Sequence, residues 1–168
     1  MALLPEAQAA NGANSRALAF LRIAVGVFFL IFGEYKVFGT QFTLHGGFQF
    51  WINRFLENGT YPFMEPVLRN FVLPHATLIA FLVAYGEFAI GVSLVLGVFV
   101  RAASVCGFLF MLTLLFSSDY PGHMAAFWQY FGASLSHSVF ALCFLGFLLG
   151  RSAEVWSLPW WRSGQRKI

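Results

Sequence analysis

Four long runs of apolar residues follow one another along the chain, and each contains at most one charged side chain. The runs are residues 17–33, 75–100, 102–118 and 124–150. About 20 apolar residues in a helix span the ~30 Å hydrocarbon core of a bilayer, and a helix satisfies its own backbone hydrogen bonds in lipid. The pattern predicts an all-α fold, an integral membrane four-helix bundle. The predicted helices span residues 17–38, 75–100, 101–118 and 126–150.

The connection between the first two predicted helices, residues 39–74, has a pattern of its own. The apolar positions that recur at helical spacing in GGFQFWINRFLENG are Phe48, Trp51, Ile52 and Phe55. Such spacing is typical of an amphipathic helix at a membrane interface. Residues 65–73 predict a second, shorter helix, with Pro66 in the first turn, where proline is tolerated. The connection either rests on lipid or covers an aromatic cavity in the bundle, and both interpretations stay open.

The composition indicates a lipid environment. Of the 168 residues, 59% are hydrophobic and 10% are charged, and 22 are phenylalanine, whereas a soluble domain has roughly 25% charged residues. A chain this short cannot bury so much apolar surface inside itself, which excludes a water-soluble globule. Residues 1–16 predict a disordered cytoplasmic tail. Residues 151–168 combine tryptophans with basic residues, which is typical of an interfacial anchor rather than of a nucleic-acid interface.

The basic residues near the helix ends predict the orientation. If both termini share one side, the seven basic residues on it are Arg16, Arg22, Arg101, Arg151, Arg162, Arg166 and Lys167, and the three on the other side are Lys36, Arg54 and Arg69. Cytoplasmic loops carry the excess of Lys and Arg. Both termini are therefore expected in the cytoplasm, with residues 39–74 outside.

Glu87 is the charged residue expected deepest in the membrane. It shares a helical stripe with the small residues Ala80, Ala84 and Gly91, which allow close helix packing. A carboxylate at the bilayer centre costs about 2.5 to 3.5 kcal/mol on insertion scales, so it needs a partner or a function. Two roles stay open: a structural pair with Arg22 or with a buried hydroxyl or amide, and a role in binding a ligand or a proton.

A second polar group is expected at the outer ends of the helices. Glu34 and Lys36 are two residues apart, so on a helix they project in nearly opposite directions. Lys36 is expected to extend to the interface, whereas Glu34 can turn toward His137 in the fourth predicted helix. With Asp119 and His123, these groups predict a polar pocket under the amphipathic segment. Alternatively, His137 bonds a hydroxyl or a carbonyl and no cavity exists.

Several types of cofactor have no matching motif. Cys106 and Cys143 are the two cysteines, lie in different predicted helices and form no CxxC, so both are interpreted as packing residues rather than as a disulfide relay. The sequence has no dinucleotide-binding glycine fingerprint, no Walker A and no HExxH. A bis-histidine haem is disfavoured because His137 alone lies well inside a predicted helix. No metal site is predicted.

Two motifs resemble one family. In LRIAVGVFFLIFGEYKVFG, Gly33 is followed three residues later by Lys36, and in GEFAIGVSLVLGVFVRAAS an acid and spaced glycines precede Arg101 and two alanines. This pattern resembles the DoxX and DoxD family of small four-helix inner-membrane proteins over roughly residues 16–150, although GRSAEVWSL departs from the ending of many members. The resemblance implies a bacterial-type inner membrane and carries over the positions Lys36, Glu87 and Arg101.

The resemblance also implies a range of functions. The DoxD branch is similar to a subunit of thiosulfate:quinone oxidoreductase, and other members look like membrane partners of thiol and superoxide defence enzymes. The first hypothesis is a redox-linked membrane subunit that holds a quinone or a similar amphiphile. Its candidate catalytic residues are Glu87, Glu34 and His137, and its candidate ligand-binding residues are Lys36, Arg101, Trp51 and His123. The alternatives are a non-enzymatic scaffold or assembly partner and a small-solute or lipid carrier. Membrane lipid, a partner subunit and a second copy of the chain are the expected partners.

Overall fold

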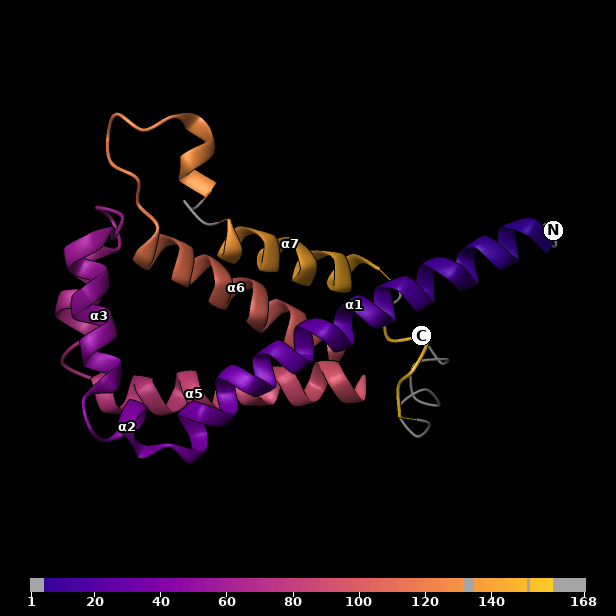
Figure 1. Cartoon of the computed structure of the whole chain (residues 1–168), viewed down its shortest axis with the longest axis horizontal. Helices are drawn as coiled ribbons and strands as arrows, with labels where there is room; N and C mark the ends of the chain where they lie inside the picture. The colour runs from indigo at the N-terminus through magenta and orange to yellow at the C-terminus, as the bar shows by residue number, and fades with distance from the viewer. Residues whose placement is uncertain (1–4, 132–134, 151, 159–168) are drawn as a thin grey trace.

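The computed structural model describes residues 5–131, 135–150 and 152–158, and within these ranges the chain is helical with no strand. The bundle consists of α1 (Pro5–Phe38), α5 (Ala76–Leu96), α6 (Val100–Ser118) and α7 (Ser136–Leu149). Figure 1 shows the four helices side by side along the long axis of the molecule. The all-α membrane helical bundle predicted from the hydrophobic pattern is confirmed.

Three of these helices are long and apolar enough to cross a bilayer, namely Gly12–Phe38 within α1, Ala76–Leu96 and Val100–Ser118. The fourth, α7, has 14 residues and is about 21 Å long at 1.5 Å per residue. It begins at Ser136, ten residues later than predicted. The preceding aromatic residues form a short 3-10 helix, η2 (Phe127–Phe131), which tertiary hydrogen bonds hold, because the Tyr61 hydroxyl donates to the Tyr130 carbonyl at 2.8 Å.

The first helix begins earlier than predicted. Residues 5–16 continue α1 without a break, where the composition predicted a disordered tail. The physical reason lies in the sequence PEAQAANGANSR, which starts with a proline, a residue tolerated in the first turn, and is rich in alanine, the strongest helix former.

Small residues bring α1 and α5 together. A Cβ atom on Gly33 would lie 2.8 Å from the backbone nitrogen of Phe88, and one on Gly91 would lie 2.8 Å from that of Leu30. Such approaches exclude a side chain, because real Cβ atoms do not come within 3.0 Å of other atoms. The predicted stripe on α5 is buried, with Ala80 and Ala84 fully inaccessible and Glu87 nearly so. Glu87 therefore lies inside the bundle, as predicted.

Residues 39–74 form a cap across one end of the bundle (Figure 1). The cap contains α2 (Thr40–Thr43), α3 (Gly47–Asn58), α4 (Glu65–Val67) and η1 (Leu68–Val72), a π-helical turn. In α3, Phe48 and Ile52 are buried against the bundle, so the predicted amphipathic helix is confirmed, whereas Trp51 is exposed. The backbone N–H of Tyr61 donates to the Phe116 carbonyl at 3.0 Å, which attaches the cap to the end of α6.

At the opposite end, residues 152–158 fold under the bundle. Arg22 is fully buried, and its guanidinium donates to the Ser157 hydroxyl at 2.9 Å and to the Trp156 carbonyl at 2.8 Å. The Leu158 N–H donates to the Leu96 carbonyl at 3.1 Å. The basic residues of the predicted anchor lie outside the described part of the chain; they are Arg151, Arg162, Arg166 and Lys167.

Candidate functional site

An ion pair joins α1 and α5 inside the bundle. Lys36 Nζ lies 2.5 Å from Glu87 Oε2, and the two side chains are 21% and 8% exposed. Lys36 is in the last turn of α1, one turn beyond Gly33, which packs directly on the backbone of Phe88. The absent side chain at Gly33 thus lets the lysine stem reach inward along α5, and the prediction that Lys36 extends to the membrane interface is wrong.

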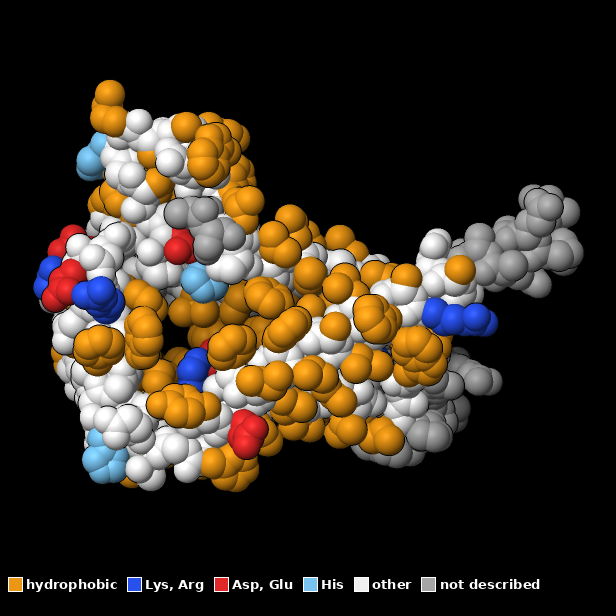
Figure 2. Space-filling view, viewed as in Figure 1, with side chains coloured by type: hydrophobic (Ala, Val, Ile, Leu, Met, Phe, Trp, Pro, Cys, Tyr) orange, Lys and Arg blue, Asp and Glu red, His pale blue; other side chains and the backbone are white. Residues whose placement is uncertain are grey.

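The ion pair lines an otherwise apolar cavity. The cavity has a volume of about 200 Å³, and its remaining walls are Phe28, Phe29, Phe32, Met111, Leu114 and Phe140. These residues come from α1, α6 and α7, while Glu87 comes from α5, so all four bundle helices contribute. Figure 2 shows a hollow in one face of the molecule, with basic and acidic side chains inside it and hydrophobic side chains around it. We call this space the bundle cavity.

The spacing of residues along α1 explains which of its side chains line the bundle cavity. Phe28, Phe32 and Lys36 are four residues apart, so they share one face of the helix. The Phe28 and Phe29 rings each lie 6.3 Å from the Phe140 ring, in edge-to-face arrangements. Phe28 and Phe32 are also 50% and 61% exposed. The bundle cavity therefore opens sideways between α1 and α7, toward the lipid side of the bundle.

The electrostatics of the site suit an uncharged ligand with polar atoms. The Lys36 ammonium lies 5.1 Å from the centre of the Phe42 ring, a cation–π contact that adds to the carboxylate in stabilising the charge. Lysine has three N–H donors and an ionised carboxylate has only acceptors. Side by side, they can donate a hydrogen bond to a carbonyl oxygen, accept one from a hydroxyl, and hold or release a proton at the Glu87 carboxylate.

Arg22 is not the partner of Glu87. The predicted pair is wrong because the Arg22 guanidinium is bound by Trp156 and Ser157 at the other end of the bundle. Arg22 precedes Lys36 by 14 residues, or about 21 Å along a helix. Glu87 instead pairs with the cation at the end of α1 that lies nearest the cap.

His137 has an acidic partner, but it is not Glu34. His137 Nδ1 lies 2.6 Å from Asp119 Oδ2, and the two side chains are 24% and 15% exposed. Asp119 directly follows α6 and His137 lies in the first turn of α7, and the packing of these two helices against each other brings the pair together. Glu34 is exposed on α1 and forms no ion pair with a described residue. Phe140, one turn beyond His137, lines the bundle cavity, so the His137–Asp119 pair lies next to its wall.

Tyrosines gather beside the His137–Asp119 pair. The Tyr61 and Tyr120 rings are 4.9 Å apart, and Tyr120 also contacts Tyr130 and His123. Burial raises the pKa of Tyr61, and the nearby negative charge of Asp119 raises it further. His123 is exposed, its ring contacts the Tyr120 ring, and it is not among the residues that line the bundle cavity.

Two other predicted ligand-binding residues are also separate from the bundle cavity. Arg101 is exposed in the first turn of α6, at the opposite end of that helix from Asp119. Trp51 lines a different pocket in the cap, together with Tyr35 and Phe42. The structure thus joins Lys36 and Glu87, places His137 nearby, and leaves Arg101, Trp51, His123 and Glu34 outside the bundle cavity.

Sequence reasoning missed the phenylalanines of α1 and α7 as cavity walls. The four-residue spacing that ends on Lys36 is a signal that was available. Within the described residues, no group of three or more His, Cys, Asp or Glu side chains is arranged to hold a metal. Cys143 packs against the core whereas Cys106 is exposed, and both are free thiols.

One family model matches the chain. The DoxX model matches residues 17–118, which is more than half of the sequence. The matched range contains Lys36 and Glu87 and ends with α6. No curated protein and no solved structure matches the chain.

Proposed function

Because the chain belongs to the DoxX family of membrane proteins, we propose that it is the membrane subunit of a redox system and binds a quinone or a similar lipid-soluble amphiphile. The observation that carries this proposal is the Lys36–Glu87 pair, which lines a cavity whose other walls are apolar. A charged pair at such a place costs free energy unless it is used or fully compensated. Small-molecule sites combine apolar walls with a few polar groups in the same way.

A quinone has apolar and polar groups that match the walls of the bundle cavity. Its ring and its isoprenoid tail are apolar and fit between the phenylalanine side chains, and its carbonyl oxygen accepts a hydrogen bond from the Lys36 ammonium. The sideways opening past Phe28 and Phe32 lets a tail remain in the bilayer while the ring enters. The cavity therefore fits the ring of the ligand rather than the whole molecule.

Reduction of a quinone to a quinol consumes electrons and protons together. The electrons come from a partner subunit, and this chain handles protons. The Lys36 ammonium, beside the Glu87 carboxylate, carries the proton that can pass to the quinone oxygen, and the His137–Asp119 pair lies one helical turn from the cavity wall at Phe140. Imidazole is the side chain suited to proton exchange near neutral pH. We assign His137 as the residue that returns protons to the Lys36–Glu87 pair.

Quinone retention tests the proposal. The protein is purified in native lipid discs, and the extracted quinone per protein is measured by mass spectrometry against discs that hold an unrelated four-helix protein. Wild type is expected to retain quinone, and Lys36→Met and Glu87→Gln are expected to lose most of it. The matched control is Glu65→Gln, which removes one partner of the exposed Arg69–Glu65 pair and should leave retention unchanged. Equal quinone in wild-type and unrelated discs would contradict the proposal.

A scaffold function is the second candidate, and the cap supports it. Four aromatic side chains of the cap are more than half exposed: Phe50, Trp51, Phe63 and Phe71. Exposed aromatic side chains are frequent anchors in protein interfaces. A carrier has no comparable support, because α1, α5 and α6 run unbroken, whereas the sites of many carriers use broken helices. Crosslinking from the cap in intact cells is read together with quinone retention: a scaffold captures partner proteins but retains no more quinone than the discs that hold the unrelated protein.

A further inference from the structure

A second pocket lies in the cap, separate from the bundle cavity. It has a volume of about 400 Å³ and is lined by the last turn of α1, by α2 and by the first turns of α3. Its side chains are Tyr35, Gln41, Phe42, His45, Phe50 and Trp51. This volume falls within the roughly 300 to 1,000 Å³ of typical small-molecule sites. We call it the cap pocket.

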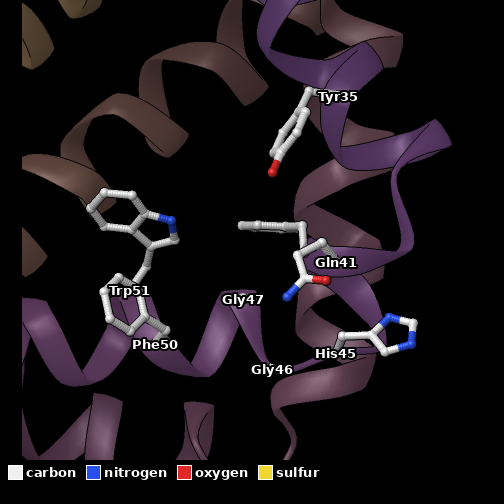
Figure 3. A pocket seen from close by; sticks show the side chains of 8 residues that line it. Tyr35, Gln41, His45, Gly46, Gly47, Phe50 and Trp51 are labelled. Carbon is white, nitrogen blue, oxygen red and sulfur yellow. The ribbon is translucent and has the colours of Figure 1, made fainter.

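The polar groups of the cap pocket are available to a ligand. Figure 3 shows the Tyr35 hydroxyl and the Trp51 indole nitrogen directed toward the space between them, with the Gln41 amide below. None of these three groups forms a hydrogen bond to another described residue of the chain. The indole donates only, whereas the tyrosine hydroxyl and the amide each donate and accept. The pocket thus offers donors and acceptors together.

His45 lies at the rim of the cap pocket, with its ring turned away from Tyr35 and Trp51 (Figure 3). Its Nδ1 lies 3.0 Å from the Thr40 carbonyl oxygen. Because a carbonyl only accepts, Nδ1 carries the proton, and in the neutral ring Nε2 is then an acceptor.

No lining residue of the cap pocket carries a formal charge when His45 is neutral. An anion would find no Lys or Arg among these side chains. A cation would meet the Phe42 ring, which already interacts with the Lys36 ammonium at 5.1 Å, so the two positive charges would repel each other. The cap pocket therefore suits an uncharged ligand.

We propose that the cap pocket binds an uncharged sugar ring. The C–H face of a sugar is apolar and stacks on an aromatic ring such as Trp51, while its hydroxyl groups donate and accept hydrogen bonds in the mixture that Tyr35, Gln41 and the Trp51 indole offer. A quinone ring presents acceptors alone and would leave the acceptors of the pocket unused. The sugar is either the head group of a glycolipid in the same membrane or a soluble glycoside.

The position of the cap pocket fits both sources. Residues 39–74 cross the end of the bundle (Figure 1), and lipid head groups lie at the ends of helices that cross a bilayer. Phe50, Trp51 and Tyr35 are each more than half exposed, so the pocket is open and a head group can enter without a change in the bundle.

Saturation-transfer NMR on the full chain in phosphatidylcholine discs tests the proposal. The probes are methyl β-glucoside, methyl β-galactoside and a monoglucosyl diacylglycerol incorporated in the disc, with decylubiquinone as a competitor. Ring protons of at least one sugar probe are expected to receive saturation. A signal from the methyl glycosides identifies a soluble source, and a signal from the glycolipid alone identifies a membrane source. Either result supports the proposal.

The variants locate the bound sugar. Trp51→Ala is expected to weaken binding about tenfold, since it removes an aromatic face and a hydrogen-bond donor, and Trp51→Phe should lose less because it keeps an aromatic face. Gln41→Leu removes the amide. Trp128→Ala is the matched control, because Trp128 is an exposed tryptophan outside the pocket.

Three results would overturn the sugar proposal: no saturation of any sugar probe, binding that is unchanged in Trp51→Ala, or equal losses in Trp51→Ala and Trp128→Ala. A test of Glu87→Gln keeps the two proposals apart. This variant is expected to lose quinone and to keep the sugar signal, so the two sites can succeed or fail independently.

Discussion

Replacing Lys36 by methionine leaves the Glu87 carboxylate without its cation. The Glu87 side chain is 8% exposed, and an unpaired charge at such a place is neutralised by taking up a proton. A free glutamate has a pKa of about 4.3, and each pH unit above it costs about 1.36 kcal/mol for protonation. The variant should therefore lose about 3.7 kcal/mol of unfolding free energy at pH 7 and about 1 kcal/mol at pH 5. The first value agrees with the about 3 to 5 kcal/mol measured when one partner of a buried pair is removed.

Reversible unfolding in mixed micelles of a mild detergent and dodecyl sulfate measures these differences. Four proteins are compared at pH 7 and pH 5: wild type, Lys36→Met, Glu87→Gln and the double variant. Because the double variant contains no charge at the site, it is expected to recover most of the loss, so the single effects should not add. Arg69→Met in the exposed pair with Glu65 is the control and should cost less than about 1 kcal/mol. A loss in Lys36→Met that is the same at both pH values, or strictly additive single effects, would refute the reasoning.

Three further predictions test the packing, the cap and the orientation. Gly33→Leu should separate α1 from α5, because a Cβ there would lie 2.8 Å from the Phe88 nitrogen, and a thermal melt should show a large drop in melting temperature. Gly12→Leu is the control, because Gly12 has open space around it, and its melting temperature should change little. Burial and Asp119 raise the pKa of Tyr61. The contribution of neutral Tyr61 to the free energy of unfolding is therefore complete below its pKa in the unfolded chain, about 10, and is lost as the pH rises through its pKa in the folded protein. In an alkaline titration, the free energy of unfolding should fall less steeply with pH in Tyr61→Phe than in the wild type. In a protein without Cys106 and Cys143, Asn58→Cys at the end of α3 should react with an impermeant maleimide from outside intact cells; labelling only after permeabilisation would invert the orientation.

The sequence predicted the features that depend on helical periodicity. The small-residue stripe on α5 and the buried face of α3 follow directly from spacing, because residues three and four apart share one side of a helix. Burial of Glu87 was predicted for the same reason. Its partner was not, because periodicity does not show how far one helix is rotated or shifted against another. The short distance between α1 and α5 at Gly33 decides that Lys36, rather than Arg22, reaches Glu87.

The helix boundaries and the His137 pair depend on tertiary contacts. Residues 126–131 have the hydrophobicity of a membrane helix, but two hydrogen bonds of Tyr130 hold this segment in another conformation. The Tyr61 hydroxyl donates to the Tyr130 carbonyl, and the Tyr130 hydroxyl donates to the Gly122 carbonyl. Asp119 and His137 are 18 residues apart, and the packing of the end of α6 against the start of α7 brings them together. No local pattern in the sequence shows that these two helix ends are neighbours.

The length of α7 has a consequence for the surrounding membrane. At about 21 Å, this helix is about 9 Å shorter than a ~30 Å hydrocarbon core. Lipid next to a short helix is compressed, because its acyl chains adjust to the hydrophobic length of the protein. The water boundary therefore comes closer to the bilayer centre beside α7 than beside α1. Since His137 lies in the first turn of α7, hydrophobic mismatch gives the bundle cavity a shorter distance to water on the side where His137 is located.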